Sequence, residues 1–177
     1  MPNWCDNNLT LTHDDPVMID RAVKAFADGK FLNEFIPIPE ALNKTTSPNK
    51  DNPEELEVKY GYSDWYAFCA AEWGTKWDVG AEQVDRLDNN NINVWFQSAW
   101  APPTEAYAKL EGLGFKIHAF YHEPGMAYAG MYADGEDETY DYGGMTADEI
   151  RDMLPEEIDE MFNISEDVKQ WLEQEME

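Results

Sequence analysis

The chain has 177 residues, of which 43% are hydrophobic, and a formal net charge of −25 from 37 acidic and 12 basic side chains. This length suits one domain, or one domain with an appendage, and the hydrophobic content excludes a chain that is disordered over most of its length. No apolar run approaches the ~20 residues that a membrane-spanning helix requires. Because nucleic-acid affinity depends on Lys and Arg neutralising phosphates, the charge argues against direct nucleic-acid binding. It favours a partner with a basic surface.

The N-terminal sequence and the cysteines indicate a cytoplasmic protein. The opening MPNWCDNN has neither the basic nor the apolar region of a secretory signal. Cys5 and Cys69 are too few and too far apart for a disulfide framework, so reduced thiols are expected. The sequence does not indicate an oligomeric state.

In chain order, the first predicted elements are a strand and a helix. Asn8–His13 alternates apolar and polar residues, which predicts a strand. A helix follows, with Asp15 as its N-cap, Pro16 at its first position and Gly29 at its end. Phe31–Ile36 then predicts a second, short strand.

The middle of the chain predicts an insertion followed by a hairpin. Asn43–Pro53 is polar and typical of a surface loop, and Ser63 is the expected cap of a helix that continues to Trp73. Ala81–Leu87 and Ile92–Trp100 flank a turn-rich segment, so together they predict a β-hairpin.

The remaining elements of the main domain are a helix and two strands. Thr104 is the expected cap of the helix, and Phe115–Tyr121 and Met126–Tyr132 are the expected strands. The full order is strand, helix, insertion, two strands, helix, strand and one further strand. This order predicts an α+β fold with a ferredoxin-like split βαβ sheet.

The charge is unevenly distributed along the chain. Residues 134–177 carry 17 acidic and two basic side chains, a net charge of −15, whereas residues 1–133 carry only −10. Apolar residues recur at helical spacing in this last quarter, where Pro155 marks a new helix and Ser165 is the expected cap of the final one. We therefore predict a ferredoxin-like α+β domain over 1–133 and an acidic helical C-terminal extension over 134–177.

Four segments, in order, resemble the YubB-type ferredoxin-like domain family carried by phages and conjugative plasmids. The resemblance covers about residues 1 to 132. The segments are MPNWCDNNLTLT at the N-terminus, EWGTKWDV (Glu72–Val79), SAWAPP (Ser98–Pro103) and YHEPGMAYAG (Tyr121–Gly130). The resemblance implies a ferredoxin-like fold and a mobile-element origin. It implies no activity and no catalytic residues.

No pattern in the sequence predicts catalysis, a metal site or a cofactor. His118 and His122 lie four residues apart on a predicted strand, so about 13 Å separates them, whereas zinc requires bonds of ~2.1 Å. Neither Cys5 nor Cys69 lies in a nucleophile signature. The carboxylates are too numerous for any pair to stand out as an acid–base couple. We therefore expect a protein that is not an enzyme.

The first candidate binding surface is the EWGTKWDV segment, with Trp73, Lys76, Trp77 and Asp78 as its candidate residues. A glycine-containing turn between two tryptophans predicts either a loop locked into the core or a concave aromatic surface for a ligand or partner. Asn3-Trp4 and Trp100 are expected in the same region.

The second candidate surface is acidic. Its candidate partner-binding residues are Asp148, Glu149, Asp152, Glu156, Glu157, Asp159 and Glu160. Helical neighbours of this kind lie about 5–6 Å apart, so the carboxylates would imitate a phosphate track and occupy a basic nucleic-acid groove. The alternative is a solvated acidic face that only adds solubility.

These observations predict a phage- or plasmid-encoded accessory protein in the host cytoplasm that binds a host protein with a basic surface. In its most specific form, it inhibits a defence or nucleic-acid-processing machine by nucleic-acid mimicry. One alternative is an enzyme or small-ligand-binding protein with a site around Trp73–Asp78. Another is a virion or assembly component.

Overall fold

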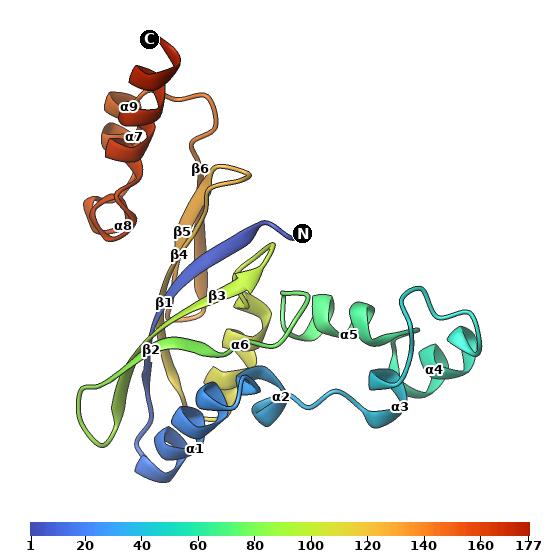
Figure 1. The fold of residues 1–177 in the computed structure, drawn as a ribbon. Coiled ribbons are helices and arrows are strands. Elements are labelled where there is room, and N and C mark those ends of the chain that lie inside the picture. The colour runs from blue at the N-terminus through green and yellow to red at the C-terminus, as the bar shows by residue number, and fades with distance from the viewer.

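The computed structural model describes all 177 residues and contains one six-stranded antiparallel sheet with helices on both faces (Figure 1). The sheet order is β2-β3-β1-β4-β5-β6. The strands are β1 (Trp4–Thr12), β2 (Ala81–Arg86), β3 (Asn91–Ala99), β4 (Lys116–Glu123), β5 (Tyr128–Ala133) and β6 (Glu136–Asp141). The chain is therefore an α+β protein.

Nine helices accompany the sheet, and none of them combines the length and apolar character needed to cross a bilayer. They are α1 (Pro16–Ala27), α2 (Phe31–Phe35), α3 (Glu40–Asn43), α4 (Pro53–Tyr60), α5 (Trp65–Glu72), α6 (Thr104–Gly112), α7 (Ala147–Met153), α8 (Glu156–Phe162) and α9 (Ile164–Glu175). In Figure 1, α3 to α5 form an arm that projects away from the sheet, whereas α7 to α9 gather near its β4–β6 end.

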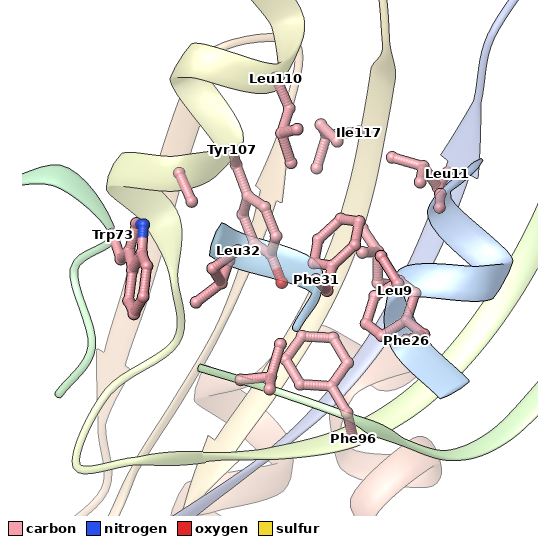
Figure 2. Close-up of a cluster of buried hydrophobic side chains, with 14 of the residues drawn as sticks. Leu9, Leu11, Phe26, Phe31, Leu32, Trp73, Phe96, Tyr107, Leu110 and Ile117 are labelled. Carbon is pink, nitrogen blue, oxygen red and sulfur yellow. The ribbon is translucent and has the colours of Figure 1, made fainter. Parts of the chain in front are cut away.

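The main core lies on one face of the sheet, under α1, α2 and α6. The alternation of β1 directs Leu9 and Leu11 to this face, and Leu9 pairs in register with Val94 of β3. Phe31 stacks on Phe26 with ring centroids 3.9 Å apart. Figure 2 shows how these side chains meet those of α6, which close the core.

The opposite face of the sheet is divided into a polar part and an apolar part. On β1 and β3, Asn8 and Asn93 exchange side-chain hydrogen bonds at 2.9 and 3.1 Å. Over β4 and β5, an apolar cluster joins the sheet to the C-terminal helices. Its buried members are Phe120, Ala129, Tyr142, Ile150, Leu154, Ile158 and Ile164. The acidic helices are thus packed on the sheet and held by apolar burial.

The predicted strand at Phe31–Ile36 is wrong, because this segment forms α2. The carboxylate of Asp78 accepts hydrogen bonds from the backbone N–H groups of Leu32 (2.7 Å) and Asn33 (3.0 Å). The first-turn amides of a helix lack partners within the helix, so this distant carboxylate favours the helix over the strand.

The predicted helix caps are also wrong at three positions. Asp64, and not Ser63, accepts the capping bond of α5 from Ala67 N–H at 2.9 Å. Thr104 is the first residue of α6, and its side chain makes no capping bond. Ser165 lies inside α9, whose N-cap is Asn163 in the left-handed region at a φ of 55°.

The extension is not helical throughout, because its first element is the strand β6. Asp134 and Gly135 have φ values of 51° and 78°, and two positive φ values are typical of the tight turn that joins antiparallel strands. β6 pairs with β5 along its length, with Thr139 opposite Gly130. The Asp134-Gly135 pair is the local sequence signal for this hairpin, but the acidic composition of the segment made the signal hard to recognise.

The four acidic residues of β6 occupy a sheet edge, where charge discourages pairing with other chains.

Candidate functional site

Two of the predicted acidic residues stabilise the C-terminal helices through hydrogen bonds. Glu149 forms a capping box with Thr146 at the start of α7, and hydrogen bonds from the Thr146 backbone and side chain lower the pKa of Glu149. Asp159 accepts hydrogen bonds from the backbone N–H (2.7 Å) and hydroxyl (2.6 Å) of Ser165, which joins α8 to α9. These two carboxylates therefore have a structural role.

The other predicted carboxylates are exposed, and most of them are unpaired. Asp148 forms an ion pair of 3.0 Å with Arg151, whose guanidinium also lies 3.5 Å from Glu166. The side chains of Asp152, Glu156, Glu157 and Glu160 make no hydrogen bond or ion pair. We refer to the exposed carboxylates of Asp148, Glu149, Asp152, Glu156, Glu157 and Glu160 as the acidic helical surface. Its negative charge is largely uncompensated.

Within the EWGTKWDV segment, Trp73 and Asp78 are part of the fold. Trp73 is buried, and its indole N–H donates a hydrogen bond of 3.0 Å to the backbone oxygen of Ile36. Burial raises the pKa of Asp78, while its three backbone hydrogen bonds, to Leu32, Val79 and Asn33, act in the opposite direction. Both side chains anchor the loop in the core. The loop interpretation expected two buried indoles and a solvated Asp78, and it is wrong for Trp77, which is 40% exposed, and for Asp78, which accepts three backbone hydrogen bonds.

Trp77, in contrast, faces solvent, and the half-buried Lys76 lies beside it. Trp77 is 40% exposed, and its ring centroid lies 6.1 Å from that of Trp4. The Lys76 ammonium lies 4.8 Å from the Trp77 ring centroid and 5.8 Å from that of Tyr66, both within cation–π range. Trp100 is 48% exposed and lines a hollow of about 150 Å³ with Tyr66 and Lys76. We refer to Trp4, Tyr66, Lys76, Trp77 and Trp100 as the aromatic surface.

The four sequence segments that carry the family resemblance converge at this end of the sheet. The Trp100 N–H donates to the Asn3 backbone oxygen at 2.9 Å. The buried Thr75 hydroxyl donates to the Ala99 oxygen at 2.8 Å, and the Tyr128 hydroxyl donates to the Trp100 oxygen at 2.7 Å. The expected proximity of Asn3-Trp4 and Trp100 is thereby confirmed. Sequence reasoning missed Thr75 and Tyr128, because only tertiary contacts distinguish them from other polar residues.

The cysteines and the two strand histidines do not form a reactive cluster. Burial raises the pKa of Cys69 to about 12 and raises that of the more deeply buried Cys5 as well. His118 is exposed, whereas His122 is buried and lies 2.6 Å from the Tyr142 hydroxyl. No group of three or more His, Cys, Asp or Glu side chains is arranged to hold a metal ion.

The fold and these contacts describe an α+β protein with an acidic and an aromatic candidate surface. No protein-family model matches the chain, and no curated protein matches it either. A crystal structure of a protein api92 from Yersinia pseudotuberculosis, of the family DUF1281, is similar with a TM-score of 0.42 and 11% sequence identity. The match covers 81% of this chain and 99% of that chain. At this similarity, it supports no inference about function.

Proposed function

We propose that the protein binds a positively charged protein through the acidic helical surface and performs no chemistry. The observation that carries the proposal is the set of unpaired carboxylates on α7 and α8, on helices that an apolar cluster holds against the sheet. Carboxylates on a fixed frame lose little conformational freedom when they meet a basic surface. Like charges gathered in one place also reduce folding stability, and an interaction with a basic partner would relieve this cost.

The proposed architecture is ferredoxin-like, and the proposed origin is a phage or conjugative plasmid. The order β2-β3-β1-β4, with antiparallel neighbours and with α1 and α6 as crossovers, supports a split βαβ sheet that β5 and β6 extend. The family resemblance of the N-terminal 132 residues supports the mobile-element origin. The protein would then act on a host partner in the cytoplasm, in its most specific form by occupying the basic groove of a defence or nucleic-acid-processing machine.

The test is an affinity purification from bacteria that carry the source phage or plasmid, washed at low salt and at 0.5 M salt. The variant Glu156→Gln/Glu157→Gln/Glu160→Gln removes three unpaired charges from α8. The matched control is Glu54→Gln/Glu55→Gln/Glu57→Gln, which removes three exposed charges from the similarly short helix α4.

We expect the α8 variant and the salt wash each to reduce the captured partner at least tenfold, because exposed charges are screened within a few ångströms at high salt. The α4 control should capture as much partner as the wild type. Equal capture by all three proteins at both salt concentrations would refute the proposal. Competition by duplex DNA or RNA for the captured partner would separate mimicry from other forms of basic-surface binding.

A second candidate function is ligand or peptide binding at the aromatic surface. The observation that favours it is Trp100, an exposed indole held at a φ of 73°, because bulky residues with such backbone strain are concentrated at functional sites. The variant Lys76→Gln/Trp77→Ala should then abolish binding or activity without unfolding the protein. The α8 charge variant should retain that function, which would distinguish this candidate from the first.

A further inference from the structure

A hollow that belongs to neither surface described above lies between α9 and the sheet. Its volume is about 570 Å³. It lies between α9, the segment Tyr142–Thr146 that joins β6 to α7, and the β4–β5 turn. Its main apolar lining residues are Ala127, Met145, Ile164, Val168, Trp171 and Leu172. We refer to this hollow as the α9 groove.

One wall of the α9 groove is an apolar stripe that the protein covers only in part. Ile164, Val168, Trp171 and Leu172 recur along α9 at the spacing that places side chains on one face of a helix. Ile164 is buried, but Trp171 remains 55% exposed. Leu172 is half-buried, so the chain covers the second half of the stripe only in part.

The α9 groove borders a further hollow along α7. A second hollow of about 340 Å³ shares Met145 with the first and is lined by Glu149, Asp152 and Met153. Methionine side chains adapt to irregular apolar partners, which suits a surface that accepts a side chain from another molecule. Because Met145 lines both hollows, we refer to them together as the track. Its first part follows α9, whose 12 residues span about 18 Å at 1.5 Å per residue, and its second part follows α7.

The charges around the track are negative. Asp167 lies in the first hollow, and Glu149 and Asp152 lie in the second. The extension has only two basic side chains, and one of them, Arg151, is already paired with Asp148 and Glu166. At the floor, burial lowers the pKa of His122, which therefore adds no positive charge at neutral pH. An apolar track with an acidic rim is complementary to a helix that has an apolar stripe and basic flanks.

We propose that the α9 groove binds an amphipathic basic helix of the partner protein. The apolar side chains of that helix would lie between Trp171 and Met145, and its Lys or Arg side chains would meet Asp167, Glu149 and Asp152. This inference rests on the proposed function, because it specifies the form of the basic partner.

The probe is an 18-residue peptide of Leu and Lys, labelled with a fluorophore, with Leu at helical i, i+3, i+4 and i+7 spacing. A second peptide has the same composition in an order that forms no apolar face. Fluorescence anisotropy with the full chain at 0.15 M salt measures both affinities. The groove variant is Trp171→Ala/Leu172→Ser, and the matched control is Val58→Ala/Leu87→Ala, which truncates two exposed apolar residues elsewhere. Circular dichroism establishes that each variant is folded.

We expect the amphipathic peptide to bind at least tenfold more tightly than its rearranged counterpart. The groove variant should lose this preference, and the Val58/Leu87 control should keep it. Equal binding of both peptides, unchanged in the groove variant but weakened by the α8 charge variant, would overturn the groove inference and leave the proposed function intact. A preference that the groove variant abolishes and the α8 variant does not change would support the groove and contradict a role of the α8 carboxylates in binding.

Two other outcomes would also overturn the inference. One is that neither peptide binds, in which case the affinity purification alone decides the proposed function. The other is that the neutral dye Nile red binds the wild type and not the groove variant, while neither peptide competes for it. That result would identify the α9 groove as a small-molecule site.

Discussion

The Tyr128 hydroxyl donates a hydrogen bond of 2.7 Å to the backbone oxygen of Trp100. The N–H group of Trp100 in turn bonds to the Asn3 oxygen, so β5 and the residue that precedes β1 both hold the Trp100 backbone. These contacts keep Trp100 at a φ of 73° with half of its side chain exposed. The backbone of this residue is therefore strained while its indole contributes to the aromatic surface.

Replacing Trp100 should reveal this strain. A residue with a Cβ atom is destabilised by about 1–2 kcal/mol in the left-handed region of backbone conformation, whereas glycine is not. We therefore expect Trp100→Gly to be more stable than Trp100→Ala by about 1 kcal/mol, the reverse of the usual order of the two residues in a strand. Urea unfolding of both variants measures the difference. An alanine variant as stable as the glycine variant would show that the backbone is not strained.

Gly130 should be required for the packing of β5 against β4 and β6. A Cβ atom at this position would overlap the phenol of Tyr121 and the backbone oxygen of Glu138. Tyr121 cannot move easily, because its hydroxyl donates to Asp137 at 2.6 Å. Gly130→Ala should lower the free energy of unfolding by about 1–3 kcal/mol, the usual cost of overpacking.

Gly112 provides the control for that substitution. It lies at the end of α6 without a positive φ, and a Cβ atom there meets nothing within 4 Å. Gly112→Ala should leave stability unchanged or raise it by about 0.4–1 kcal/mol. Denaturant melts of the two variants side by side check both values. Equal effects at the two positions would contradict the described packing of β5.

The carboxylate of Asp78 should stabilise α2 through its backbone hydrogen bonds. Asp78→Ala leaves the amides of Leu32, Asn33 and Val79 without this acceptor, and hydrogen bonds to a charged group contribute about 1.5–3 kcal/mol. We expect a loss of this size in urea unfolding, together with faster hydrogen exchange at the Leu32 amide. Unchanged exchange at Leu32 would indicate that α2 does not depend on this cap.

His122 should make part of the stability depend on pH. Burial lowers the pKa of its imidazole, despite the opposing effect of the nearby carboxylates of Asp6, Glu123 and Asp167. The unfolded chain then binds more protons as the pH falls through the ordinary histidine pKa of about 6.5. The stability contributed by neutral His122 is thus complete above that pH and is lost below it.

The measurement is the urea midpoint of the wild type and of His122→Gln at pH 7.5 and 5.5. Because the 37 acidic side chains can also titrate, only the difference between the two proteins is informative. His122→Gln should lose less stability, or gain more, than the wild type on acidification. His118→Gln, on the same strand but exposed, is the control. Parallel pH dependence of wild type and His122→Gln would argue against a buried neutral imidazole.

The local pattern of residues in the sequence was sufficient to predict several elements of the fold. The alternation of β1 placed Leu9 and Leu11 in the core, and Asp15 and Pro16 begin α1 as the cap preferences predict. The pattern of Phe31–Ile36 was misleading, because the cap that makes it helical comes from Asp78, more than 40 residues away.

For the candidate site as well, the sequence predicted some features and not others. Composition located the acidic helices, and the aromatic residues of EWGTKWDV were visible as a motif. Whether each of these residues supports the fold or faces solvent was not predictable. Trp73 and Trp77 belong to the same short segment, yet one is buried and the other is 40% exposed.

The sequence by itself determined the acidic character of the protein, the strands β1 to β5 and the apolar stripe of α9. These features follow from composition and from the periods of helices and strands, which are local properties. Only the tertiary structure decided which carboxylates are unpaired, which indoles gather around Lys76, and that the stripe of α9 borders an open groove. Each of these depends on contacts between residues distant in the chain, and packing establishes such contacts only when the whole chain is folded.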